Sequence, residues 1–101
     1  MIASIIITNY NYEKFLGRCI RSCLNQIISE KYEVILVDDC SKDKSIKIAN
    51  EFKHFNNFKI IQNKENIGVA ASANSGFRKA KGKYIVRIDA DDYVSKNFLF
   101  F

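Results

Sequence analysis

The apolar positions of the chain change their spacing several times along its length. Four short segments are nearly continuous in apolar and β-branched residues, which is typical of strands covered on both faces of a sheet. These predicted strands are residues 3–8, 33–37, 58–62 and 84–88. Between them, apolar residues recur at steps of three and four, which predicts amphipathic helices. The predicted helices are residues 13–29, 42–55 and 69–81. This alternation indicates an α/β fold, with a mostly parallel sheet and helices on both of its faces.

Polar and small residues mark the expected ends of these helices. Ser41 is the expected N-cap of the second helix, with Asp43 in its first turn, where the helix dipole favours an acid. Gly82 is expected to stop the third helix. Residues 70–75 of that helix are mostly Ala and Ser, so we expect its backbone to approach the neighbouring element closely.

Acidic side chains follow two of the predicted strands. Residues 89–92 (Asp-Ala-Asp-Asp) come directly after the last strand, and Asp38 and Asp39 follow the second. In open parallel sheets, ligands bind beyond the carboxyl ends of the strands, so both groups are expected at one edge. Clustered carboxylates offer hard oxygen ligands to a divalent cation, with a phosphate on its far side. A nucleotide site is therefore the first hypothesis, and a solvated turn is the alternative.

Two loops at the same edge offer groups that suit a nucleoside. Tyr10 presents an aromatic face on which a base can stack, and Asp39 presents an acceptor that matches the N3–H donor of uracil. Uridine is therefore the favoured nucleoside, and its ribose and a metal-bound diphosphate would lie at the acids after the fourth strand. Asp38 has an equal alternative as a turn-capping residue. Neither G-x-G-x-x-G nor a phosphate-binding P-loop occurs in the chain.

Composition narrows the remaining classes. The 101 residues are 48% hydrophobic and 27% charged, which predicts one globular domain over residues 1–101. Apolar runs reach only about four residues, far short of the ~20 of a membrane helix, so we expect a cytoplasmic protein, or one held peripherally at the inner face of the membrane. The net charge of +5 comes from scattered lysines without an aromatic–basic platform, so nucleic acid is not an expected partner. Cys19 and Cys23 lie on the apolar stripe of the first helix and are expected to be buried thiols.

Five segments, in this order, resemble family 2 glycosyltransferases. They are residues 4–11, 22–26, 33–43, 66–76 and 82–92. The resemblance covers nearly the whole chain. It implies the GT-A fold, of which this chain is the Rossmann-like, donor-binding half. It also implies transfer of a sugar from a nucleotide donor, usually UDP-linked, with inversion and with Mg²⁺ or Mn²⁺. The acceptor would be a glycan or a lipid-linked sugar, and the family suggests cell-surface polysaccharide biosynthesis.

The resemblance also assigns roles to individual residues. The implied nucleotide-binding residues are Thr8, Tyr10, Asp39 and Asp89. In this assignment Thr8 and Tyr10 border the base, Asp39 accepts from uracil, and Asp89 faces the ribose. The segment 89–92 matches the D-x-D motif, which makes Asp91 the first expected metal ligand and Asp92 the rival ligand. Two positions depart from the family pattern, since Cys40 stands where glycine is common and Ala73 stands where an arginine often precedes Asn-x-Gly.

The family's catalytic base and acceptor site lie in a second half of similar size, beyond residue 101. We therefore expect this chain to be a donor-binding part truncated after the D-x-D motif. A module that binds nucleotide without catalysing transfer is the alternative, and a metal-dependent nucleotidyltransferase ranks below it because the glycine-rich first loop is missing. The apolar residues 98–101 are expected to fold back on the sheet edge or to join two copies in a homodimer.

Overall fold

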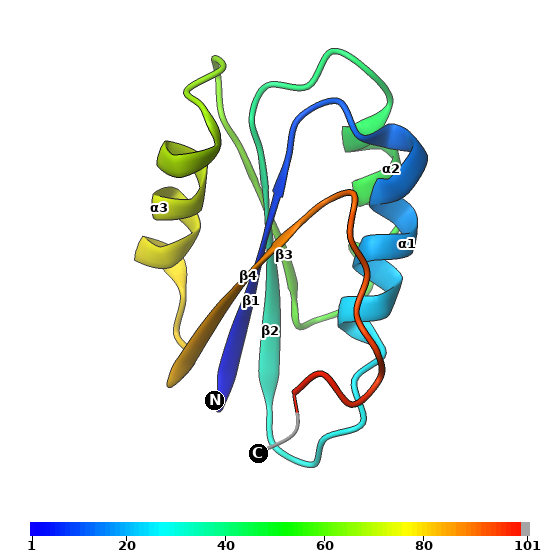
Figure 1. Cartoon of the computed structure of the whole chain (residues 1–101), viewed down its shortest axis with the longest axis vertical. Helices are drawn as coiled ribbons and strands as arrows, with labels where there is room; N and C mark the ends of the chain where they lie inside the picture. The colour runs from blue at the N-terminus through cyan, green and yellow to red at the C-terminus, as the bar shows by residue number, and fades with distance from the viewer. Residues whose placement is uncertain (100–101) are drawn as a thin grey trace.

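A computed structural model of the protein describes residues 1–99, which form one sheet with helices on both faces (Figure 1). The strands are β1 (Ala3–Asn9), β2 (Tyr32–Asp38), β3 (Phe58–Gln62) and β4 (Tyr84–Asp89), in the sheet order β3-β2-β1-β4. The helices are α1 (Glu13–Leu24), α2 (Ser45–Asn50) and α3 (Val69–Lys79). All strand pairs are parallel, and α1 and α2 cover one face while α3 covers the other. The predicted α/β fold is confirmed, and each strand ends within one residue of its prediction.

The two central strands hold the core. Every residue of β1 and β2 is buried, because each strand has a neighbour on both sides and a helix over each face. Side chains alternate between the faces, so Ile5 and Ile7 pack with the buried residues of α1 while Ile6 faces α3. Cys19 and Cys23 are fully buried in α1, as predicted. On α3, a Cβ atom at Gly76 would lie 2.5 Å from Ile6, which shows how closely this small-residue helix approaches the sheet.

The first helix is shorter than its apolar spacing predicts, so the prediction over residues 13–29 is wrong at its C-terminal end. α1 ends at Leu24, with Asn25 as its C-cap. Beyond it, the N–H of Ile27 donates to the carbonyl of Lys96 at 2.7 Å, and the Ile27 side chain is 65% exposed. A partner distant in the sequence therefore takes the place of the next helical hydrogen bond. In the described part of the chain, no helix is long and apolar enough to cross a membrane.

The second helix is also shorter than the predicted residues 42–55, and Ser41 is not its N-cap. Lys44 precedes the first helical residue and makes no side-chain cap. The Ser41 hydroxyl instead donates to the Asp38 carboxylate at 2.7 Å, which holds it in the loop after β2. After α2 the chain continues as turns over residues 51–54, closed by bonds between residues three apart, and these tighter turns replace the α-helical pattern.

Asp43 and Gly82 do not act as helix signals in the predicted way. Asp43 precedes α2, and its carboxylate accepts from the backbone N–H groups of Ser45 at 2.9 Å and Glu13 at 3.0 Å, so that one side chain serves the N-termini of two helices. α3 ends at Lys79, three residues before Gly82. A Cβ atom at Gly82 would lie 2.3 Å from the carbonyl carbon of Ala3, so glycine is required there by contact with the backbone of β1.

The C-terminal segment folds back on the domain as far as it is described. Leu99 is 3% exposed and belongs to the core cluster on the α1 face of the sheet, whereas Phe98 is 39% exposed. Phe100 and Phe101, which belong to the same predicted apolar cluster, lie outside the described residues. The folding back is thus observed for Leu99, and the homodimer stays a prediction.

Candidate functional site

The carboxyl ends of β1, β2 and β4 and the start of α3 enclose a cavity of about 550 Å³. Its walls carry five of the six predicted site residues: Thr8, Tyr10, Asp39, Asp89 and Asp91. Asp92 lies beside this cavity without lining it. The register explains the convergence, because Thr8 on β1 is level with Asp89 on β4, and the next residue, Asn9, is level with Asp38 on β2. Residues 30 to 80 positions apart in the sequence therefore meet at one edge of the sheet.

Asp39 holds one wall of the cavity in place. Its Oδ1 accepts from the N–H of Ile67 at 2.8 Å and from Nδ2 of Asn63 at 3.0 Å, and its Oδ2 accepts from the N–H of Gly68 at 2.9 Å. Burial acts to raise the pKa of Asp39, but these bonds and the nearby Ser72 hydroxyl together hold it below its ordinary value. Asp39 is therefore an anionic acceptor at neutral pH, and it fixes the loop before α3.

Asp38 serves the turn rather than the cavity. Its Oδ1 accepts from Nδ2 of Asn9 at 2.8 Å and from the Ser41 hydroxyl, and its Oδ2 accepts from the Ser41 N–H at 2.9 Å. The side chain is 1% exposed and does not line the cavity. Of the two readings that the sequence left open for Asp38, the structure favours the turn-capping one.

Asp89 is engaged by two neighbours on the cavity wall. Its Oδ1 lies 2.7 Å from Nη2 of Arg87 and accepts from the Thr8 hydroxyl at 3.3 Å. The Arg87 and Asp89 side chains are 41% and 50% exposed, so their ion pair adds little to stability and can rearrange when a ligand enters. Arg87 is the single cationic side chain among the residues that line the cavity.

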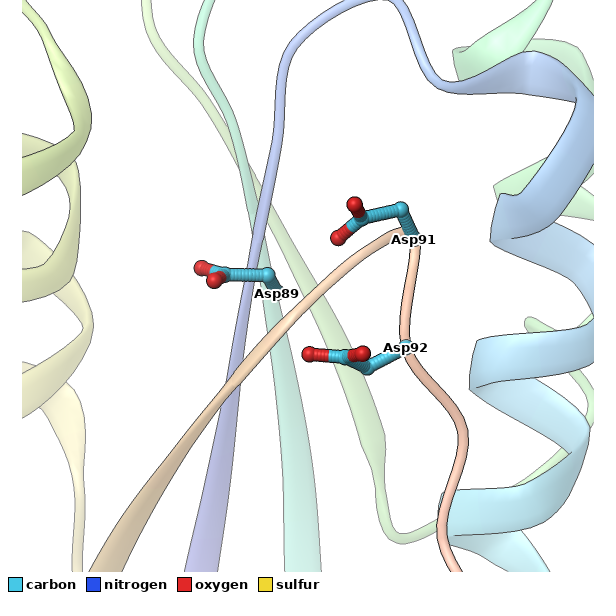
Figure 2. A group of neighbouring side chains, drawn as sticks. All are labelled: Asp89, Asp91 and Asp92. Carbon is cyan, nitrogen blue, oxygen red and sulfur yellow. The ribbon is translucent and has the colours of Figure 1, made fainter.

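Asp89, Asp91 and Asp92 form a cluster that could hold a cation (Figure 2). One carboxylate oxygen of each lies within 4.8 Å of those of the other two, and all three residues are exposed. In Figure 2 the three side chains project away from α1. An all-oxygen, anionic donor set on an open face fits Mg²⁺ or Mn²⁺, which retain water and substrate oxygens as further ligands. The residues present therefore fit the cation that the sequence implied.

Several cavity residues were not among the site residues predicted from the sequence. They are Asn9, Tyr12, Asn66, Gly68, Val69, Ser72 and Arg87. Two of them carried a usable signal. Arg87 is the one charged residue inside the apolar strand before the acids, and Gly68 immediately precedes α3 with a φ of 92°, which turns its N–H toward Asp39. Of the others, Asn9 ends β1 and Tyr12 precedes α1. Asn66, Val69 and Ser72 reach the site because α3 and the loop before it fold against β1 and β2.

Cys40, which stands where the family commonly has glycine, adopts a left-handed backbone conformation with a φ of 63°. That conformation costs a side-chain-bearing residue about 1–2 kcal/mol, whereas glycine adopts it freely. The backbone geometry of the turn after β2 therefore explains why glycine suits this position.

The chain matches known proteins over nearly its whole length. The sequence profile for Glycosyl transferase family 2 matches residues 4–100. The poly(ribitol-phosphate) beta-glucosyltransferase of Bacillus spizizenii is 39% identical over 102 residues, which cover 98% of this chain and 16% of that protein. Among the relatives compared, the share of the relative that is covered ranges from 14% to 39%, so the chain spans well under half of their length.

Solved structures also resemble the chain over nearly its whole length. The Staphylococcus aureus protein TarS, residues 1–349, in complex with UDP, superposes with a TM-score of 0.91 at 32% identity, covering 98% of this chain and 30% of that one. The structure of GalNAc-T7 with UDP, GalNAc and Mn²⁺ superposes with a TM-score of 0.84 at 26% identity, covering 98% of this chain and 20% of the other. TarS of Staphylococcus aureus, a poly(ribitol-phosphate) beta-N-acetylglucosaminyltransferase, is therefore among both the relatives found by sequence and those found by structure.

Proposed function

Because the chain belongs to glycosyltransferase family 2, we propose that it is the donor-binding part of an enzyme that transfers a sugar from a UDP-sugar to an acceptor. The observation that carries this proposal is the convergence of five predicted site residues on one 550 Å³ cavity at the carboxyl edge of the sheet. Its volume lies within the 300–1,000 Å³ typical of small-ligand sites. Support for UDP comes from TarS, which was crystallised with UDP and with UDP-GlcNAc.

In this proposal the uracil lies between Tyr10 and the Asp39 wall. The ring of Tyr10 is 43% exposed, so one face is free to stack on a base. Asp39 already accepts two hydrogen bonds at Oδ1 but only one at Oδ2, which leaves Oδ2 as the acceptor for the uracil N3–H. Thr8 borders the base, and Asp89 faces the ribose after it separates from Arg87.

The diphosphate lies over the acidic cluster. Asp91 is the proposed first ligand of Mg²⁺ or Mn²⁺, with Asp92 as the rival ligand and Asp89 beside them. Such an ion would supply neutralisation of the negative charge that develops on the departing diphosphate. Arg87 contributes a further positive charge on the same wall of the cavity. This charge matters because position 73, where the family often has an arginine, is an alanine in this chain.

The acceptor and the location of the protein are proposed only as broad classes. We place the acceptor among glycans or lipid-linked sugars of the cell surface, in line with the poly(ribitol-phosphate) transferases that the chain resembles. No residue among those described is assigned as the catalytic base. We also propose that the protein is cytoplasmic, and the alternative is that it is attached peripherally to the inner face of the membrane.

Calorimetric titration with UDP and with UDP-sugars, with and without Mn²⁺, tests the proposal. We expect binding that tightens when Mn²⁺ is present, and we expect Asp91→Ala to abolish that gain while Glu51→Ala, which removes an exposed acid away from the cavity, leaves it unchanged. Binding without any release of sugar from the donor would favour a nucleotide-binding module over an enzyme. An absence of binding by the wild type would refute the proposal.

A further inference from the structure

The segment after β4, residues 90–99, returns along α1 without forming a strand or a helix of its own (Figure 1). Only Ala90 and Leu99 of this segment are buried, so the position of the other residues depends on the contacts that their backbone and side chains make with the rest of the domain. Many of these contacts come from one stripe of three residues, at positions 18 and 22 on one side of α1 and at position 26 just beyond its end.

The three stripe residues contact the segment at successive points. The Arg18 guanidinium lies 4.2 Å from the centre of the Tyr93 ring, and its Nη2 is 3.5 Å from the carbonyl oxygen of Asp91. The Ser22 hydroxyl accepts from the N–H of Val94 at 3.1 Å. These two contacts hold the backbone directly around and after the acidic residues.

Gln26 holds the far end of the segment with both ends of its amide. Its Nε2 donates to the carbonyl of Ser95 at 2.7 Å, and its Oε1 accepts from the N–H of Leu99 at 2.8 Å. Leu99 is buried in the core, so this end is anchored by packing as well. At the start of the segment, the Cys19 thiol lies 3.7 Å from the carbonyl oxygen of Asp89.

The carboxylates themselves are not held by donors. Among residues 1–99, no side chain or backbone group makes a hydrogen bond or ion pair with the Asp91 or Asp92 carboxylate. Their mutual spacing therefore depends on the course of the backbone that carries them. That backbone is fixed on one side by β4 and on the other side by the stripe on α1.

We propose that Arg18, Ser22 and Gln26 are positioning residues, which set the spacing of the Asp91 and Asp92 carboxylates and thereby the affinity for the divalent cation. The inference rests on the proposed function for the identity of that cation. Groups that orient metal ligands from outside the coordination sphere commonly change metal affinity by about tenfold or more when they are removed. The stripe would act in this way through the backbone.

The sign of the Arg18 effect separates this inference from simple electrostatics. Arg18 is positively charged, so removing it should strengthen the binding of a nearby cation if charge alone matters. If Arg18 instead positions the acidic loop, Arg18→Ala should weaken the binding of Mn²⁺, by about tenfold. Arg21→Ala is the matched control, because Arg21 is an exposed arginine on the same helix without a contact to residues 90–99.

The experiment titrates Mn²⁺ into each variant, alone and with UDP, and follows free Mn²⁺ by electron paramagnetic resonance. Thermal unfolding is measured on the same samples. The loss of Mn²⁺ affinity should fall in the order Arg18→Ala, Ser22→Ala, Gln26→Ala, following distance from the ligands. The loss of melting temperature should follow the opposite order, because Gln26 anchors the buried Leu99. A purely structural stripe would give the same order in both measurements and would overturn the inference.

A second readout does not depend on the metal. In the ion-free protein, amide hydrogen exchange at Val94 should accelerate in Ser22→Ala, and exchange at Leu99 should accelerate in Gln26→Ala but much less in Gln26→Glu, which keeps the acceptor oxygen. If the wild type binds Mn²⁺ no more tightly than the stripe variants do, this inference is wrong while the proposed function still stands. A wild type that binds no Mn²⁺ even with UDP overturns the metal role in the proposed function, and the inference with it.

Discussion

Asp39 provides the sharpest test of how the cavity is built. Its carboxylate accepts three hydrogen bonds from the loop before α3, two at Oδ1 and one at Oδ2. Asp39→Asn keeps the shape but leaves only one acceptor oxygen, so the new amide NH₂ must face either the Gly68 N–H or the two donors at Oδ1. The negative charge that strengthens all three bonds is also lost.

The expected cost follows from these bonds. A hydrogen bond to a charged group contributes about 1.5–3 kcal/mol and a neutral one about 1 kcal/mol, so losing one bond and the charge on two others costs about 2.5–7 kcal/mol before any compensation. Relief from burying a charge offsets part of this. We therefore expect Asp39→Asn to lower the free energy of unfolding by about 2–3 kcal/mol at pH 7, and to weaken UDP binding because the loop lines the cavity.

The pH dependence of this difference gives the decisive measurement. Folding lowers the pKa of Asp39 below its ordinary value of 3.8, so its stabilising contribution is complete well above pH 3.8 and is lost as the pH falls through the folded-state pKa. Urea unfolding of both proteins between pH 7 and pH 3 should therefore show the difference shrinking in acid. The contributions of the other acidic residues to the pH dependence cancel in this difference, since both proteins contain them.

Asp92→Asn is the matched control for this measurement. It makes the same chemical change at an exposed carboxylate that accepts no hydrogen bond among the described residues, so we expect a change in the free energy of unfolding within about 0.5 kcal/mol at pH 7. A difference between the wild type and Asp39→Asn that stays constant from pH 7 to pH 3 would refute the reasoning. So would a cost at pH 7 no larger than that of the control.

Three further predictions concern stability and assembly. Glu33 is buried at the amino end of β2, where it accepts from the Ser4 hydroxyl at 2.6 Å and pairs with Lys59 at 3.3 Å. We expect Glu33→Gln to lower the free energy of unfolding in urea by about 2 kcal/mol and to leave the affinity for UDP unchanged. A loss of UDP affinity would contradict the prediction that Glu33 acts on stability alone. Cys40→Gly should stabilise the protein by about 1 kcal/mol by relieving the left-handed backbone, and a lower melting temperature would argue against that. Sedimentation at micromolar concentration should show a homodimer that Phe98→Asp dissociates, whereas a wild type that sediments only as monomer would exclude it.

The features that local sequence patterns control were predicted well. The β-branched apolar runs gave four strands at the right places, since a strand that must be covered on both faces can hardly use other residues. Parallel strands separated by helices bring their carboxyl ends to one edge, which is why the sequence alone predicts Asp39, Asp89 and Asp91 at one site. Both results follow from spacing along the chain.

The features that depend on distant partners were decided only by the tertiary structure. α1 stops at Leu24 because the next residues bind the segment after β4, and Ser41 leaves the helix cap because Asp38 takes its hydroxyl. Likewise, Asp39 is held by residues 63–68, and Arg87 reaches the cavity through the pairing of β4 with β1. Each of these choices is made by a hydrogen bond or a packing contact between residues far apart in the sequence. Local periodicity carries no information about such partners. The sequence by itself therefore determined the elements and the edge of the sheet at which the cavity lies, and folding determined which side chains line that cavity.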